Sequence, residues 1–171
     1  MLKKIALLLA LMIPVGLFAQ NVKFGHVNSE EILVVMPEFI KAKADVEKLA
    51  KQLEDELKRT QEELNKKYNE LQQAIAEKSI PDNIAERRTK EIREMVDRQD
   101  AFKQEAGDQI RKAQQEAMLP IQKKLNDAIV AVGKAENVVY VFDLSVTPIP
   151  YINEALSIDL TNKVKAHLGI K

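Results

Sequence analysis

Cysteine is absent from the chain, which excludes a disulfide framework, a thiolate metal site and a lipid anchor attached through cysteine. Tryptophan is also absent and aromatic residues make up only 5% of the sequence, so there is little material for one large globular core. The 26 basic residues equal the 26 acidic ones, and this balance gives no reason to propose nucleic acid or an anionic membrane surface as a partner. What remains is a chain with 30% charged residues, a composition typical of long helices.

The motifs of catalysis and cofactor binding are missing as well. The sequence has no G-x-S-x-G nucleophile motif, no glycine-rich phosphate loop and no H-E-x-x-H zinc motif. The two histidines, His26 and His167, are far apart, and neither lies in a cluster of metal-ligating residue types. The carboxylates alternate with basic residues, as on a solvated helix face. We therefore predict a protein that is not an enzyme and that has no cofactor, no metal site and no catalytic residues.

The first segment resembles an export signal. Two lysines precede an apolar run over residues 5–18, and Ala19 supplies the small residue expected before a cleavage point, so residues 1–19 are predicted to be a signal peptide. The mature chain would start near Gln20. The alternative is an uncleaved anchor, but a run of about 14 residues is shorter than the roughly 20 needed to span a bilayer. No later stretch is long and apolar enough, so we expect an exported protein without stable membrane insertion.

A short α/β segment follows this signal. Residues 22–27 (VKFGHV) are rich in strand formers and predict a strand, and Asn28 with Ser29 can cap a short helix after it. Pro37 suits the first turn of a further helix, because that position needs no backbone N–H donor. Residues 20–37 are thus predicted to form the first part of a small body.

A long helix is predicted next. Residues 38–78 contain neither proline nor glycine and are dominated by Ala, Leu, Glu, Lys and Gln, which predicts one helix of about 60 Å. Its apolar stripe consists of Val46, Leu49, Leu53, Leu57, Thr60, Leu64, Tyr68, Leu71 and Ile75. The spacings of 3, 4 and 4 form an eleven-residue repeat, which predicts a straight or faintly right-handed pairing with a second helix.

The chain is predicted to turn back at residues 79–83 (SIPDN). Ser79 and Asp82 have the spacing of a capping box, and Pro81 suits the start of the return helix, predicted over residues 84–119. The same 3, 4, 4 spacing recurs in Gln99, Phe102, Ala106, Ile110, Ala113, Ala117 and Ile121. Matching repeats on two helices joined by a tight turn predict an antiparallel hairpin over residues 38–120. Gly107 is either a hinge or a close helix contact, and the sequence leaves both readings open.

Residues 121–171 are predicted to complete the body. Pro120 marks the point where the return helix enters the body with a kink, because Ile121, Leu125, Ile129 and Val132 continue a helical face beyond it. Residues 138–142 (VVYVF) are apolar at every position, so we predict a strand that is buried on both faces.

The end of the chain is predicted to contain a turn, an edge strand and a helix. Two prolines at 148 and 150 predict the turn, and residues 151–152 the edge strand. Asp159 or Thr161 is expected to cap a final helix that ends at Gly169.

The fold class predicted from these segments is α+β and mostly helical, with a long antiparallel helical hairpin and a small β-rich body. A body of roughly 65 to 70 residues without disulfide or metal lies near the limit of independent stability, and oligomerisation is a common remedy. A strand that is apolar on both faces favours the same conclusion. The candidate assembly residues of the body are Val22, Phe24, Val138, Val139, Tyr140, Val141 and Phe142.

Apolar side chains gather in the distal half of the predicted hairpin. The candidate contacts for a bound molecule are Tyr68, Leu71, Ile75, Ile80, Ile84, Ile92, Met95, Val96 and Phe102. The alternative is that these side chains pack the hairpin against itself. Ile80, in the turn, and Val96, beside the stripe, fit that alternative least.

Four segments occur in a recognisable order behind the signal and around the charged hairpin. They are M-P-E-F at 36–39, L-P-I-Q-K-K-L-N-D-A-I at 119–129, V-Y-V-F-D at 139–143 and L-T-N-K-V-K-A-H-L-G-I-K at 160–171. In this order they resemble the Skp/OmpH family of periplasmic chaperones, over essentially the whole mature chain. No single motif is specific; the order and the closing segment carry the resemblance.

The resemblance implies a function and an assembly. It implies a periplasmic homotrimer in which strands from three chains form a small barrel and three hairpins surround a cavity. It also implies that unfolded outer-membrane β-barrel proteins are held in that cavity without ATP. The best-known members are strongly basic and this chain is not, so lipopolysaccharide binding is not part of the expectation. The alternative function is a structural coiled-coil spacer or scaffold of the cell envelope.

Overall fold

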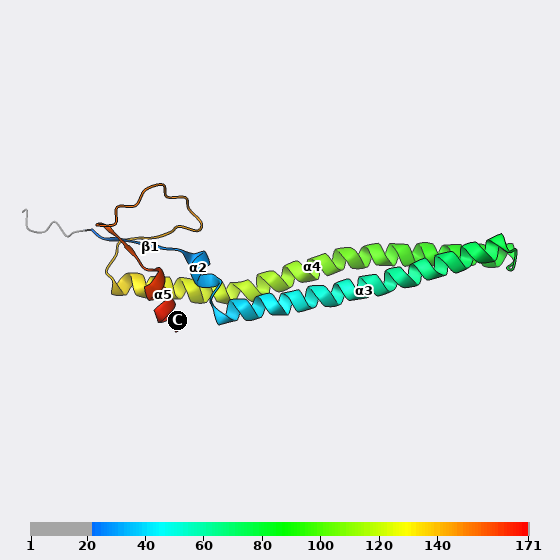
Figure 1. Ribbon diagram of the computed structural model, residues 1–171, viewed down its shortest axis with the longest axis horizontal. Coiled ribbons are helices and arrows are strands. Elements are labelled where there is room, and N and C mark those ends of the chain that lie inside the picture. Colours follow the sequence, from blue (N-terminus) through cyan, green and yellow to red (C-terminus); the bar gives the residue numbers. More distant parts are fainter. Residues whose placement is uncertain (1–21, 171) are drawn as a thin grey trace, which may run out of the picture. The chain divides into compact units, whose positions relative to one another are not determined.

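The computed structural model describes residues 22–170 (Figure 1). The predicted signal peptide and the predicted new N-terminus lie outside the described residues. The elements in chain order are β1 (Phe24–Val27), α2 (Ser29–Leu33), α3 (Pro37–Ala76), α4 (Asp82–Ala135), β2 (Val141–Asp143), β3 (Ser157–Asp159) and α5 (Thr161–His167). The chain is thus mostly helical with one small sheet, and the predicted α+β class is confirmed. Across the described residues, none of the helices combines the length and the apolar character that crossing a bilayer requires.

The chain divides into two compact units. One unit consists of residues 34–124, which form a helical hairpin, and the other combines residues 22–33 with residues 125–170. The long helix α4 contributes to both units, because the division falls between Lys124 and Leu125.

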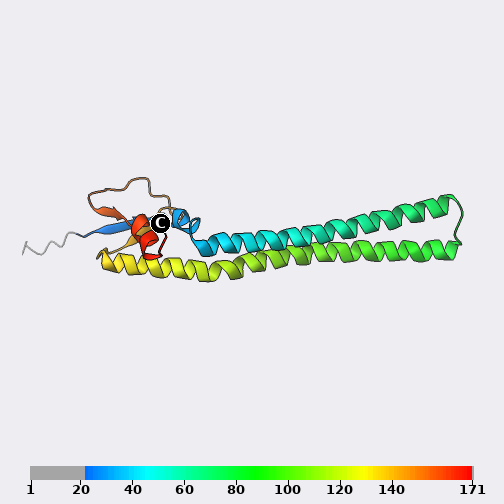
Figure 2. The same ribbon diagram turned by 60° about the horizontal axis from the view of Figure 1, so that its bottom comes forward.

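The hairpin unit is formed by α3 and the larger part of α4, which run side by side in opposite directions (Figures 1 and 2). Pro37 occupies the first turn of α3, as predicted, where its missing N–H leaves no bond unmade. The most deeply buried residues of the predicted stripes are Leu64, Leu71, Gln99, Ala106 and Ile121. Toward the turn the stripe shifts, because Tyr68 and Ile75 are exposed while Ala74 is half-buried.

The turn between the two helices begins with a left-handed residue. Lys78 has φ of 52°, its N–H donates to the Ile75 carbonyl at 3.1 Å, and the N–H of Ser79 donates to the Ala74 carbonyl at 3.0 Å. These two bonds form a Schellman motif, which satisfies the last carbonyls of α3. The predicted capping box is wrong, because the Ser79 hydroxyl also donates to Ala74 instead of capping α4. The Pro81 carbonyl accepts the first bonds of α4, from Ile84 and Ala85.

The return helix continues beyond Pro120, as predicted. The segments on the two sides of this proline belong to one helix that ends at Ala135. An interior proline costs about 3 kcal/mol in an isolated helix. Here Ile121, Leu125 and Val132 are buried after it, and this packing outweighs the cost.

The sheet of the second unit is parallel, with the strand order β2-β1-β3. Gly25 pairs with Val141 on one side and with Ile158 on the other. The predicted edge strand at residues 151–152 is wrong, because the third strand is Ser157–Asp159. Residues 151–152 instead belong to the long connection over residues 144–156, which the two prolines keep out of the ladder.

Helices cover one face of this sheet. A Cβ on Gly25 would lie 2.7 Å from Leu160 Cδ1, and a Cβ on Gly133 of α4 would lie 3.2 Å from Val141 Cγ2. The covered core consists of Val27, Ile32, Leu125, Ala128, Val132, Leu160 and Val164. The prediction of a strand buried on both faces is wrong for the single chain, because Val139, Tyr140 and Phe142 are 56%, 63% and 43% exposed.

The two short helices of this unit are capped much as predicted. The Asn28 side chain accepts from the N–H of Glu31 at 3.1 Å and caps α2. Asp159 accepts from the N–H of Thr161 at 2.8 Å, although the N-cap residue of α5 is Leu160, which makes no side-chain cap bond. The helix ends at His167, and Gly169 follows it with φ of 75°.

Candidate functional site

The candidate contact residues of the hairpin separate by exposure. Leu71 is only 3% exposed and packs between the two helices of the hairpin, α3 and α4, which are called the rods below. A bound molecule cannot reach this side chain while the rods are paired. Tyr68, Ile75 and Val96 are exposed, and the half-buried members are Ile80, Ile84, Ile92, Met95 and Phe102. Apart from Leu71, these side chains offer accessible apolar surface distributed along the distal half of the hairpin.

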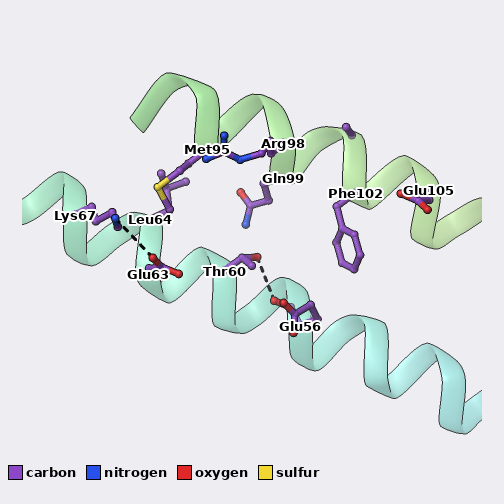
Figure 3. A pocket seen from close by; sticks show the side chains of 11 residues that line it. Glu56, Thr60, Glu63, Leu64, Lys67, Met95, Arg98, Gln99, Phe102 and Glu105 are labelled. Carbon is purple, nitrogen blue, oxygen red and sulfur yellow. Dashed lines mark hydrogen bonds and ion pairs between the residues drawn. The ribbon is translucent and has the colours of Figure 1, made fainter. Parts of the chain in front are cut away.

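The middle of the hairpin is hollowed on two sides. A hollow of about 590 Å³ is lined by Glu56, Thr60, Glu63, Leu64, Lys67, Met95, Arg98, Gln99, Ala101, Phe102 and Glu105. A second hollow of about 790 Å³ is lined by a different set of residues from the same two helices, and the two sets share Gln99. In Figure 3, Gln99 and Phe102 both point from α4 toward α3. The predicted contacts Met95 and Phe102 therefore meet Leu64 and Gln99, which were not predicted as contacts.

Two smaller hollows lie near the start of α3. One of about 290 Å³ is lined mainly by Phe39, Ala42, Val46, Ala117 and Met118, and one of about 360 Å³ includes Pro120 and Ile121. Small alanines facing larger side chains leave this space unfilled. These residues were not predicted as contacts, although the alanines that recur in the α4 stripe are a signal for them.

An ion pair joins the start of α3 to α4 near these hollows. Lys124 donates a hydrogen bond to Glu38, and this bond lowers the pKa of the Glu38 carboxyl below its usual value. The two residues lie on α4 and α3, so the contact joins the rods where α3 begins.

The remaining charge of the hairpin is balanced along each helix. The exposed ion pairs that join two residues of the same helix include Lys43–Glu47, Glu56–Arg59, Glu63–Lys67, Lys66–Glu70, Arg87–Glu91, Asp100–Lys103, Asp108–Arg111 and Lys112–Glu116. Such pairs contribute only about 0.3 to 0.5 kcal/mol each. Along most of their length the rods are therefore held together by the apolar stripe and not by charge.

The second unit presents an open aromatic face on the side of its sheet that no helix covers. The ring centroids of Phe24 and Phe142 are 6.3 Å apart, as are those of Tyr140 and Phe142. This separation is typical of favourable aromatic contacts. Of the seven candidate assembly residues, Val22, Val139, Tyr140 and Phe142 are exposed, and Phe24, Val138 and Val141 are half-buried.

Polar groups surround this aromatic face. His26 Nδ1 lies 2.8 Å from the Ser157 hydroxyl. Burial raises the pKa of Asp159, but the hydrogen bonds from Thr161 and the charges of His26 and Lys165 outweigh this effect and the pKa is lowered. His26 is thus held by a structural contact of the sheet. Among residues 22–170, no three His, Asp or Glu side chains are grouped so that they could hold a metal ion.

Comparison with known proteins decides the family. The sequence pattern of the family described as "Outer membrane protein (OmpH-like)" matches residues 23–168. The chain belongs to the OmpH-like family. This agrees with the resemblance found in the sequence. No curated protein matches the chain.

A solved structure shares the fold of this OmpH-like protein. It is a crystal structure from Caulobacter crescentus CB15, described as a candidate outer membrane chaperone (OmpH-like). The TM-score is 0.72 at 18% sequence identity, with 86% of this chain and 83% of that chain covered. At this identity the similarity concerns the fold.

The OmpH-like chain also exposes apolar residues that were not predicted as contacts. They lie in the connection over residues 144–156, where Val146, Tyr151 and Leu156 are exposed. Figure 1 shows this connection as a wide excursion between β2 and β3. This connection contains two prolines, at 148 and 150, within an apolar stretch. Prolines favour an extended backbone and cannot donate to a sheet ladder, so they are a sequence signal for a segment outside the sheet.

Proposed function

We propose that this OmpH-like protein is an ATP-independent periplasmic holdase that binds unfolded outer-membrane β-barrel proteins and prevents their aggregation. The observation that carries the proposal is the accessible apolar surface spread along a charged helical hairpin. An unfolded barrel strand exposes apolar side chains at alternate positions, so a holder needs many weak contacts over a large adaptable surface. The charged faces between these contacts would keep the loaded complex dispersed.

The proposal includes assembly into a homotrimer. The aromatic face around Phe24, Tyr140 and Phe142 is open in a single chain, and an exposed apolar patch of this kind is typical of an interaction site. Other copies of the chain would cover it, and the number three comes from the family resemblance. Three hairpins would then enclose a space for the client.

The proposal also includes export. The sequence pattern of residues 1–19 supports secretion, and a compartment without ATP requires that binding and release proceed without nucleotide. Release would follow when folding of the client in the membrane is more favourable than its residence between the hairpins.

An aggregation assay tests the proposal directly. A urea-unfolded outer-membrane β-barrel protein is diluted into buffer with increasing amounts of the purified protein, and light scattering is recorded. Scattering should be suppressed at about one trimer per client, with the trimer mass measured by sedimentation in the same buffer. No suppression at any ratio would reject the holdase. A pull-down dominated by one folded envelope protein, without preference for unfolded barrels, would favour the scaffold alternative.

A further inference from the structure

One polar residue interrupts the apolar contact between the rods. Gln99 is only 7% exposed, on the inward stripe of α4 that also carries Phe102 and Ala106. Within residues 22–170, its carboxamide makes no hydrogen bond to another protein group, and its polar atoms keep access to solvent. Because Gln99 lines a hollow on each side of the hairpin, its amide can be reached by a molecule that enters there.

The polar residue opposite does not supply that partner. Thr60 lies in the corresponding stripe of α3, but its hydroxyl donates to the backbone carbonyls of its own helix, at 3.1 Å to Glu56 and 2.9 Å to Leu57. Figure 3 shows the Gln99 carboxamide between the two helices, directed toward this part of α3. The amide keeps both its donor and its acceptor for a molecule that enters from outside.

The hollow beside Gln99 is large enough for such a molecule. Its volume of about 590 Å³ lies within the range of about 300 to 1,000 Å³ that is usual for ligand pockets. Leu64, Met95 and Phe102 form apolar walls, and charged side chains stand around them. The hollow on the other side of Gln99 has only Ala50 and Leu57 as apolar residues in its lining, so an apolar guest is expected in the first hollow.

We propose that the hollow beside Gln99 binds an extended segment of the unfolded client. One apolar client side chain packs against Leu64, Met95 and Phe102, and an adjoining peptide group of the client exchanges hydrogen bonds with the Gln99 carboxamide. An extended chain offers both features within two residues, because its side chains alternate and its peptide groups are unpaired. The recognition is independent of the client's sequence beyond one apolar residue. This inference rests on the proposed function and locates its contact.

Replacement of Gln99 by leucine tests the role of the carboxamide. Gln99→Leu makes the stripe apolar throughout, so the urea midpoint of unfolding should rise. The client's peptide group loses its partner, and the Kd for a urea-unfolded outer-membrane β-barrel protein should rise about fivefold. Gln104→Leu is the matched control, because Gln104 is exposed on the same helix. This control should leave the Kd unchanged.

A crosslinking measurement in the native-like protein locates the client without relying on the leucine variant. A benzophenone amino acid at Phe102 should crosslink to the client in several times the yield obtained from Lys103, which lines the opposite hollow. Equal yields from the two positions overturn the inference. So does a Gln99→Leu protein that binds the client as tightly as the unchanged protein. If the unchanged protein holds no client at all, the proposed function fails as well, and this outcome is distinct from a failure confined to the variants.

Discussion

Two residues other than glycine end their helices in the left-handed region. Lys78 and Asn137 have φ of 52° and 54°, and each lies at the position where glycine usually closes a helix. The N–H of Val138 donates to the Gly133 carbonyl at 3.2 Å, so the end of α4 repeats the Schellman bonding found at the end of α3. Asparagine tolerates this conformation better than lysine does, and the turn of the hairpin therefore carries the greater backbone strain.

Gly107 lies in the interior of α4, and its replacement by alanine should stabilise the protein. An alanine Cβ would meet no atom within 4 Å, so the expected gain is the helix propensity difference of about 1 kcal/mol. Urea unfolding monitored by circular dichroism measures the change. Gly133→Ala is the control and should gain less, because its Cβ would lie 3.2 Å from Val141 Cγ2. A loss of stability in Gly107→Ala would contradict the prediction.

The structure resolves one of the two readings that the sequence left open for Gly107. A close helix contact is wrong within the single chain, because the space beside the residue is open. The hinge stays a prediction. Spacing along one helix shows which residues face inward but not how near the opposite helix comes, so the sequence could not separate the two readings.

At the scale of elements, Asp143 links the end of β2 to the start of α2. Its carboxylate accepts from the N–H of Ser29 at 3.2 Å, and from the N–H and the hydroxyl of Ser145 at 3.1 Å and 2.8 Å. Burial raises the pKa of Asp143, but these hydrogen bonds outweigh burial and the pKa is lowered from its ordinary value of 3.8. The carboxylate therefore stabilises the folded state at neutral pH.

This link predicts a dependence on acid. Because the folded pKa lies below the unfolded one, the stabilisation is present above about pH 4 and is lost as the pH falls through the folded pKa. Asp143→Asn keeps an acceptor oxygen but loses the charge, so it should be less stable at neutral pH by about 1 kcal/mol or less. The two proteins should converge in strong acid, as thermal unfolding across pH would measure. A difference that grows with acidity would contradict the assignment.

The elements differ in how far the sequence predicted them. The rods were predicted because a 3, 4, 4 spacing repeated over many turns identifies a helix and its inward face. Strand β3 was missed because three residues are too few for a pattern, and its position depends on pairing with β1, far away in the sequence. The continuation of α4 beyond Pro120 was predictable because Ile121, Leu125 and Val132 keep a helical spacing, and these residues are buried in the structure.

At the scale of the whole molecule, the open aromatic face predicts the oligomeric state. The double change Tyr140→Ser and Phe142→Ser removes two exposed rings, each contributing about 1.5 to 3 kcal/mol when buried. The dissociation constant of the assembly should rise by roughly two orders of magnitude, which sedimentation over a concentration series would measure.

A change on the hairpin provides the control for this prediction. Tyr68→Ser also removes an exposed ring, but from α3, and it should leave the mass unchanged. Circular dichroism should confirm that both variants are folded. An assembly of unchanged mass in the double variant would show that the aromatic face is not the interface.

The candidate site could be predicted in part. Spacing placed Gln99 and Phe102 on the inward stripe and Met95 among the contacts, and the structure brings all three to one hollow. Thr60 and Gln99 are polar residues in two stripes that are otherwise mostly apolar. These two polar positions are the sequence signal for the hollow between the two helices. The gap itself depends on side-chain volumes on both helices at once, which a pattern along one helix does not contain.

The pairing of opposite charges within each helix has a consequence for the choice of client. Because many cations of the hairpin are paired with an anion about one turn away on the same helix, the electric fields of these pairs cancel within a few ångströms of the surface. The hairpin then neither attracts nor repels a polypeptide at long range. We expect acidic and basic barrels to be captured at similar rates, with little influence of ionic strength.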